Sequence, residues 1–237
     1  MPYREVLILA MTKMRAGICA AGFTRESDPV TGLRWVRPVR DFGPLLQGDM
    51  TDADGRLVEC GDVIGLNMIK PRPDPPHVED WVVDFVRHRP RLLRRLEGEK
   101  RAHLFSRYLD PTPEDVLVHH TRSLCLVQPA QLWARFSLDA YSGTYQARMG
   151  FTLPRDANHP HATGRRGVSV TDIRWRALGR SWLGEKGGHL AMDQDALCER
   201  LAVDEAYLSL GLSRNWQGAY WPLVVGVHTV PDYEFRS

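Results

Sequence analysis

Leu33-Arg34-Trp35-Val36-Arg37-Pro38-Val39 is a short string that nearly repeats in the second half of the chain as Ile173-Arg174-Trp175-Arg176-Ala177-Leu178. Each copy follows a turn-forming stretch, and each places a tryptophan among arginines on what reads as a β-strand. Tryptophan beside arginine is typical of surfaces that meet nucleic acid, and it is equally ordinary in sheets. The two copies predict that one type of β unit occurs twice.

The alternation of side chains along a strand decides which residues of the two strings face a core. Trp35 and Trp175 share a face with apolar residues, so both are predicted to be core residues rather than platforms for stacked bases. Arg37 is in phase with Trp35, and we expect it either to pair with a buried acid or to reach a groove. The binding candidates in these strings are Arg37 and the arginines that point to the opposite side, Arg34, Arg174 and Arg176.

Outward from these strings, the chain consists of short apolar runs divided by turn-forming residues. Its 237 residues include 16 prolines and 20 glycines, which favours a mainly β architecture. Arg4 to Met11 is predicted to be a buried strand, and the best helix candidates are residues 90–109 and 193–201. We expect two OB-like small β-barrels in tandem, residues 1–118 and 119–237, with one or two short helices. A pair of SH3-like barrels or a single β-sandwich fits the strand count almost as well.

Charge, cysteine spacing and hydropathy exclude several classes of protein. A formal net charge of +2 at pH 7 is too small to imply a nucleic-acid partner, so the distribution of charge matters more. The cysteines lie far apart and never form a CxxC pair, which excludes a local zinc knuckle and a thioredoxin-type motif. No apolar run approaches the roughly 18 residues of a membrane span, and the first residues lack a signal-peptide pattern. We therefore expect a cytoplasmic protein.

Two segments carry most of the candidate phosphate contacts. Residues 87–101 hold the densest positive charge, and on a helix their arginines would share a polar side that can follow a phosphate backbone. A solvated face whose side-chain stems cover leucines is the alternative. The loop at residues 154–167 is the longest polar insertion between predicted strands. The candidates in these segments are Arg87, Arg89, Arg91, Arg94, Arg95, Arg165 and Arg166.

Signs of catalysis are weak. His159 and His161, separated by one residue in the same loop, are a weak candidate for part of a metal site, because further ligands would have to come from elsewhere in the chain. No nucleophile lies in a G-x-S-x-G elbow, and no glycine-rich segment matches a phosphate-binding loop. We therefore expect no cofactor and no catalytic residue.

Several strings together resemble the dual OB-containing domain family. They are the W-x-R-P pattern of Trp35, Arg37 and Pro38, Gly61-Asp62-Val63, Val170-Thr171-Asp172, Leu208-Ser209-Leu210-Gly211, and the apolar closing strand Leu223 to Val230. The resemblance covers nearly the whole chain and implies two OB-like barrels. It also implies a prokaryotic protein associated with nucleic-acid processing and antiviral defence, and a broad binding role without an established catalytic motif.

The leading hypothesis is a non-enzymatic nucleic-acid-binding accessory protein that holds single-stranded DNA or RNA mainly by phosphate contacts. The alternative is a metal-dependent hydrolase or nuclease built on the loop at 154–167. A third possibility is a protein-interaction subunit that uses the apolar and aromatic segment 216–235.

Overall fold

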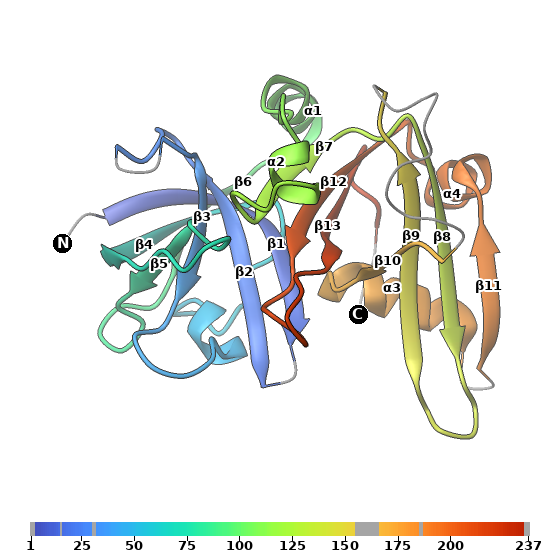
Figure 1. Ribbon diagram of the computed structural model, residues 1–237, viewed down its shortest axis with the longest axis horizontal. Coiled ribbons are helices and arrows are strands. Elements are labelled where there is room, and N and C mark those ends of the chain that lie inside the picture. Colours follow the sequence, from blue (N-terminus) through green and yellow to red (C-terminus); the bar gives the residue numbers. More distant parts are fainter. Residues whose placement is uncertain (1–2, 15, 30–31, 155–165, 185–186, 235–237) are drawn as a thin grey trace.

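The computed structural model describes residues 3–14, 16–29, 32–154, 166–184 and 187–234. The first unit of the fold is a β-barrel (Figure 1, blue to cyan). Its strands are β1 (Tyr3–Met14), β2 (Gly17–Thr24), β3 (Trp35–Val39), β4 (Asp62–Pro71), β5 (Asp80–Val83) and β6 (Arg91–Arg95), with the 3-10 helix η1 (Gln47–Met50) between β3 and β4.

The order of the hydrogen-bonded strands is that of an OB barrel. It runs β1-β2-β3-β5-β4, and β4 pairs with β1 to close the ring. The β3–β5 pairing is parallel and the other pairings of the ring are antiparallel. Strand β6 pairs with the first residues of β4, Asp62 to Gly65, and is not one of the five strands of the ring. This closure leaves few free edges among the five strands.

The second unit is a seven-stranded sheet with helices packed against it (Figure 1, green to red). Its hydrogen-bonded order is β11-β8-β9-β10-β13-β12-β7. The strands are β7 (Leu124–Val127), β8 (Gln131–Leu138), β9 (Tyr145–Thr152), β10 (Val168–Val170), β11 (Gly188–Met192), β12 (Glu205–Leu212) and β13 (Pro222–Val230). The α-helices in the described residues are α1 (Gly98–Arg107), α2 (Glu114–Leu117), α3 (Ile173–Leu183) and α4 (Gln194–Leu201).

Strand β1 is buried on both faces, which explains its continuous apolar run. Val6 and Ile8 point into the barrel core. Leu7 and Leu9 point outward, into a separate hydrophobic cluster between the barrel and the second unit. That cluster also contains Leu126 of β7, together with Tyr207 of β12 and Val225 of β13. The first strand therefore carries apolar side chains on both sides because it separates two cores.

The two units touch over the outer face of the barrel. Gly226 of β13 lies so close to β1 that a Cβ atom there would be 2.1 Å from the backbone oxygen of Leu9. Nearby, the buried carboxylate of Glu79 accepts hydrogen bonds from the Ser123 backbone N–H (2.8 Å), the Ser123 hydroxyl (2.9 Å) and the Leu124 backbone N–H (3.1 Å). Apolar burial and buried hydrogen bonds together join the units.

The expectation of a mainly β chain with two OB-like units and few helices is confirmed. The prediction of a helix over residues 90–109 was wrong at its start. Arg91 to Arg95 form strand β6, where Arg91 pairs with Gly65 and Arg95 with Asp62. The helix α1 begins only at Gly98, whose positive φ of 55° marks the change of direction. Pairing with β4 is a long-range contact, and local helical periodicity does not reveal it.

The second copy of the repeated string is a helix, so its prediction as a strand was wrong. Trp175, Leu178 and Gly179 are buried and fall at helical spacing. The side chain of Asp172 accepts a hydrogen bond from the backbone N–H of Trp175 (3.0 Å) and caps the first turn. The burial of both tryptophans is nevertheless confirmed, with Trp35 5% and Trp175 1% exposed.

Candidate functional site

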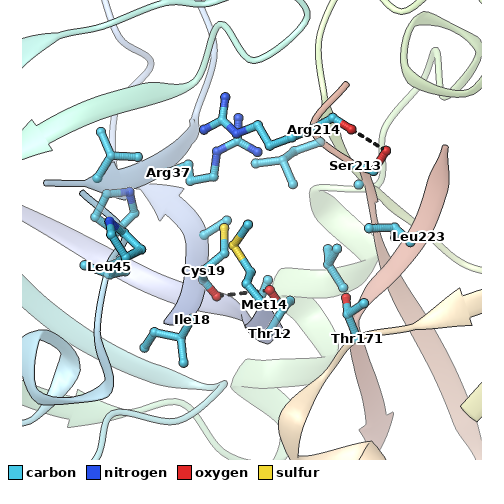
Figure 2. A pocket seen from close by; sticks show the side chains of 18 of the residues that line it. Thr12, Met14, Ile18, Cys19, Arg37, Leu45, Thr171, Ser213, Arg214 and Leu223 are labelled. Atoms are coloured by element: carbon cyan, nitrogen blue, oxygen red, sulfur yellow. Dashed lines mark hydrogen bonds between the residues drawn. The ribbon is translucent and has the colours of Figure 1, made fainter. Parts of the chain in front are cut away.

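A pocket of about 280 Å³ lies where the outer face of the barrel meets the second unit (Figure 2). Strands β2 and β3 supply one wall, and β12, β13 and the segment after β12 supply the other. We call it the interunit pocket. OB folds typically bind their ligands on the face of the second and third strands and on the loops next to it. Its residues include Lys13, Ile18, Cys19, Arg37, Arg40, Leu45, Arg72, Thr171, Ser213, Arg214 and Leu223.

Arg37 is the most deeply buried cation of this pocket. Its residue is 5% exposed, and its Nε donates to Oδ1 of Asp80 at 2.5 Å. Burial alone would lower the pKa of Arg37, but the nearby negative groups, Asp80 foremost and Glu79 with it, together outweigh burial, so the net shift is upward and the guanidinium stays charged. Nη2 of Arg37 is buried and has no hydrogen-bond partner among the described residues. An unsatisfied buried donor costs about 1–3 kcal/mol.

A second arginine reaches the same carboxylate from the other unit. Nη2 of Arg214 lies 2.7 Å from Oδ2 of Asp80, so Arg37 and Arg214 share a single buried acid. Figure 2 shows the two guanidinium groups side by side at one end of the pocket. Arg214 also lies 3.6 Å from the exposed Asp74, so two carboxylates face the two guanidinium groups at this end of the pocket.

The rim of the interunit pocket adds further positive charge. Arg40 lies 3.7 Å from Asp49, and Nη1 of Arg72 donates to the backbone oxygen of Asp41 at 2.9 Å. The described residues that line the pocket include Lys13 as well, but no aspartate or glutamate. Most of the remaining lining is aliphatic. This combination of an apolar wall and a cationic rim suits an anion that has an apolar body.

Cys19 and His77 lie close to these charges. The thiol of Cys19 projects into the interunit pocket, and burial raises its pKa. His77, in the segment between β4 and β5, is 1% exposed. Burial and the charges of Arg37 and Arg214 lower the pKa of His77 to about 3, so its imidazole is neutral at pH 7.

Three of the predicted arginines lie together in a different place, an open groove of about 660 Å³ on the first unit. Arg87, Arg89 and Arg91 line it, and none of them forms an ion pair with another described residue. Tyr3 lies across Gly65, where a Cβ atom would be 1.9 Å from the tyrosine oxygen, and its residue is 49% exposed. We call this the outer groove.

Acidic residues lie on one side of the outer groove. Asp52 is 7% exposed, and its Oδ1 accepts the backbone N–H groups of Asp54 (3.0 Å) and Arg56 (2.9 Å). Asp54 is exposed at the same edge. The three arginines exceed these two acids by one charge. The groove thus combines arginines that have no ion-pair partner among the described residues with an exposed aromatic ring, the two components of a surface for unpaired nucleotides.

Other predicted arginines have intramolecular partners. Arg94 pairs with Glu5 at 3.1 Å, and Arg95 contacts Asp62 at 3.1 Å. Arg174 lies on α3, where it pairs with Asp232 at 3.0 Å and its guanidinium lies 4.2 Å from the ring centroid of Tyr233. A cation that is already paired has less charge to offer a phosphate.

The remaining candidates are scattered. Arg34 lies 5.0 Å from the ring centroid of Tyr108, and Arg176 donates to the backbone oxygen of Val170 at 3.2 Å. Arg166 is exposed. Arg165, His159 and His161 lie outside the described residues. Among the residues that are described, no group of three or more His, Cys, Asp or Glu side chains is arranged to hold a metal ion.

The segment proposed as an interaction surface divides into exposed and buried parts. Trp216 and Trp221 are about half exposed, at 50% and 54%. By contrast, β13 is a central strand of the second sheet, and Tyr233 is 1% exposed in its core. Much of segment 216–235 therefore belongs to the core of the second unit.

The sequence did not indicate all the residues that complete the interunit pocket and the outer groove. It singled out Arg37, but Asp80 and Arg214 meet only because two units pack together, and their separation in the chain gives no local signal. Tyr3 was missed because its exposure depends on a neighbour without a side chain, Gly65, on the adjacent strand.

A closed five-stranded barrel in the OB order, with an arginine-rich pocket on its outer face, defines this chain as an OB-fold protein. Residues 4–227 match the dual OB-containing domain family, so the chain belongs to that family. No curated protein and no solved structure matches the chain. The fold is one that typically binds oligonucleotides. Within the described residues, every helix is too short or too polar to cross a membrane.

Proposed function

We propose that the protein is a non-enzymatic accessory factor that binds single-stranded nucleic acid along the outer groove. The observation that carries this proposal is the gathering of Arg87, Arg89 and Arg91 beside the exposed ring of Tyr3. Charges without an acidic partner can neutralise phosphates and release their counterions. A role in nucleic-acid processing or antiviral defence is part of the proposal that the family resemblance suggests.

Single strands are favoured over duplexes because of the aromatic ring. A base can stack on Tyr3 only when its face is free, and such a contact contributes about 1–3 kcal/mol. Gly65 supports this geometry, since it leaves the back of the tyrosine ring in contact with the sheet. The phosphate contacts do not distinguish DNA from RNA or one sequence from another.

The test is fluorescence anisotropy with labelled single-stranded DNA, single-stranded RNA and duplex DNA over a range of salt concentrations. We expect single strands to bind with micromolar or tighter affinity, and the affinity to fall steeply with salt. The double variant Arg87→Ala/Arg91→Ala should reduce the slope of log K against log salt by about 1.4 on single strands, since each phosphate contact contributes about 0.7. Tyr3→Ala should lower the affinity for single strands more than the affinity for duplex DNA.

Arg94→Ala is the matched control. Arg94 lies on the same strand as Arg91 and is exposed, but it pairs with Glu5 and lies outside the outer groove. Its removal should leave affinity and salt slope nearly unchanged. If the wild-type protein binds none of the three nucleic acids at low salt, the proposal fails.

A further inference from the structure

We propose that the interunit pocket is a second, separate site that binds the 5′-phosphate end of one nucleotide. The nucleotide can be a free mononucleotide or the terminal residue of a strand, because both offer the same phosphate monoester next to a base and sugar. This site does not depend on the outer groove, since the two share no lining residue.

The first argument is the unsatisfied nitrogen of Arg37. Nη2 of this buried guanidinium has no hydrogen-bond partner among the described residues, although Nε holds Asp80 at 2.5 Å. The Asp80 carboxylate also fixes the guanidinium in place, so little side-chain entropy remains to be lost on binding. A phosphate oxygen would satisfy the free donor through a charge-assisted hydrogen bond.

The second argument is the charge of the pocket. Five cationic residues line it, and the acids paired with them are Asp80, Asp49 and Asp74, the last of these 3.6 Å from Arg214. The five cations therefore exceed these three acids by two positive charges. A phosphate monoester carries about −1.5 to −2 at pH 7, so it would balance this excess, whereas a carboxylate would balance only half of it.

The third argument is shape. The volume of about 280 Å³ is near the lower end of small-molecule sites, which span about 300–1,000 Å³. It holds one nucleotide but not a longer stretch of strand. Ile18, Leu223 and Val225 offer aliphatic surface for the faces of a base. Thr171 lies in the same lining, and its hydroxyl makes only a long hydrogen bond of 3.4 Å, to the Val224 backbone oxygen, so it can serve a polar edge of the base.

The packing of the units explains why this face is a pocket and not a long groove. Strands β2 and β3 form the outer face that other OB folds leave open for an oligonucleotide. Here Leu124, Leu212 and Leu223 of the second unit close over it. Arg214 comes from the same unit, so the covering wall also supplies a cation, and the site is complete only in the intact chain.

The experiment uses Cys19 as a reporter within the pocket. In a Cys198→Ala background, Cys19 is the only half-buried thiol among the described cysteines, because Cys60 and Cys125 are buried. Alkylation by iodoacetamide at pH 8.5 is followed by mass spectrometry, with AMP, adenosine, and an oligonucleotide with either a 5′-phosphate or a 5′-hydroxyl. We expect AMP or the 5′-phosphorylated strand to slow alkylation of Cys19, and adenosine and the 5′-hydroxyl strand to have little effect.

Affinity is measured in parallel by isothermal titration calorimetry with AMP and with the 5′-phosphorylated strand. Arg72→Ala removes an exposed rim cation whose one described hydrogen bond goes to the Asp41 backbone oxygen, so folding should be retained. The Arg72→Ala variant should bind the phosphorylated probes with about tenfold lower affinity. Arg91→Ala, in the outer groove, is the control and should leave the pocket unaffected.

The two probes separate the sources of the phosphate. Binding of AMP supports a free mononucleotide, and Arg72-dependent binding of only the 5′-phosphorylated strand supports a strand end. If neither probe protects Cys19 or binds at millimolar concentration, or if adenosine protects as well as AMP, the inference is overturned. The 5′-hydroxyl strand tests the outer groove alone. If the Arg87→Ala/Arg91→Ala variant loses binding of this strand, the result bears on the outer groove and not on the interunit pocket, so the failure of one proposal can be told from the failure of the other.

Discussion

His77 is an imidazole that is held in its neutral form by burial and, to a smaller extent, by the charges of Arg37 and Arg214. The pKa of His77 is about 3 in the folded protein and about 6.5 in the unfolded chain. Between these values only the unfolded chain takes up the proton. Above about pH 6.5, His77 therefore does not lower the free energy of unfolding. As the pH falls from 6.5 towards 3, protonation of His77 in the unfolded chain lowers the free energy of unfolding. We expect the wild type to lose about 2 kcal/mol at pH 5 relative to pH 7 on account of this group.

The measurement is urea unfolding of the wild type and His77→Leu at pH 5, 6 and 7. Leucine is apolar and cannot titrate, so the variant should lose less stability on acidification. His228, which is also buried with a lowered pKa, is present in both proteins, and its contribution cancels. Parallel stability curves for the two proteins would contradict the assignment.

At the scale of one element, Asp172 connects helix α3 to strand β13. One carboxylate oxygen accepts the backbone N–H of Trp175, and the other accepts that of Val227 at 2.8 Å. Asp172→Ala removes a helix cap and leaves a buried N–H without a partner. We expect the free energy of unfolding to fall by about 2–4 kcal/mol, as measured by urea denaturation.

Asp193 provides a matched comparison at the start of α4. It also caps a helix, through the backbone N–H of Ala196 at 3.0 Å, but it is exposed and no hydrogen bond to a strand accompanies the cap. Asp193→Ala should therefore cost only about 1 kcal/mol. Equal losses for the two variants would show that the link between α3 and β13 adds nothing.

For the whole molecule, the shared hydrophobic cluster between the units predicts a single unfolding transition. Leu9 and Val225 belong to this cluster from opposite units, and Glu79 adds buried hydrogen bonds across it. Calorimetric and spectroscopic unfolding of the wild type should coincide in one transition. Glu79→Gln removes the charge of this acceptor. Both backbone N–H groups donate to one oxygen, which the amide retains, and the amide NH2 can donate to the Ser123 hydroxyl, so the loss of charge-assisted hydrogen bonds should cost about 1–2 kcal/mol.

Glu97→Gln is the control for this charge change. Glu97 is exposed, and the ion pair it forms with Arg95 is long, at 3.9 Å. Its replacement should change stability by less than about 0.5 kcal/mol. Two resolved transitions in the wild type would mean that the units fold independently. The division of the chain at residue 118 stays a prediction.

The sequence by itself determined the mainly β class, most of the strands and the burial of both tryptophans. These follow from local patterns: short apolar runs between turns, and apolar neighbours around each tryptophan. For Trp175 the burial was correct, but the strand alternation used to predict it was not, because the residue lies on helix α3. It also pointed to Arg37 as a charge on an apolar face. Local pattern failed for α3, where the spacing of Trp175, Leu178 and Trp182 fits a helix as well as the neighbouring residues fit a strand.

Only the tertiary structure decided which arginines are free. Arg91, Arg94 and Arg95 look alike in the sequence, yet Arg91 lines the outer groove while Arg94 and Arg95 face carboxylates from distant segments. The closure of the barrel face by the second unit is equally invisible in a local string, because β1 and β13 meet across almost the full length of the chain. Charge and burial at a site depend on such long-range neighbours, whereas periodicity depends only on nearby residues.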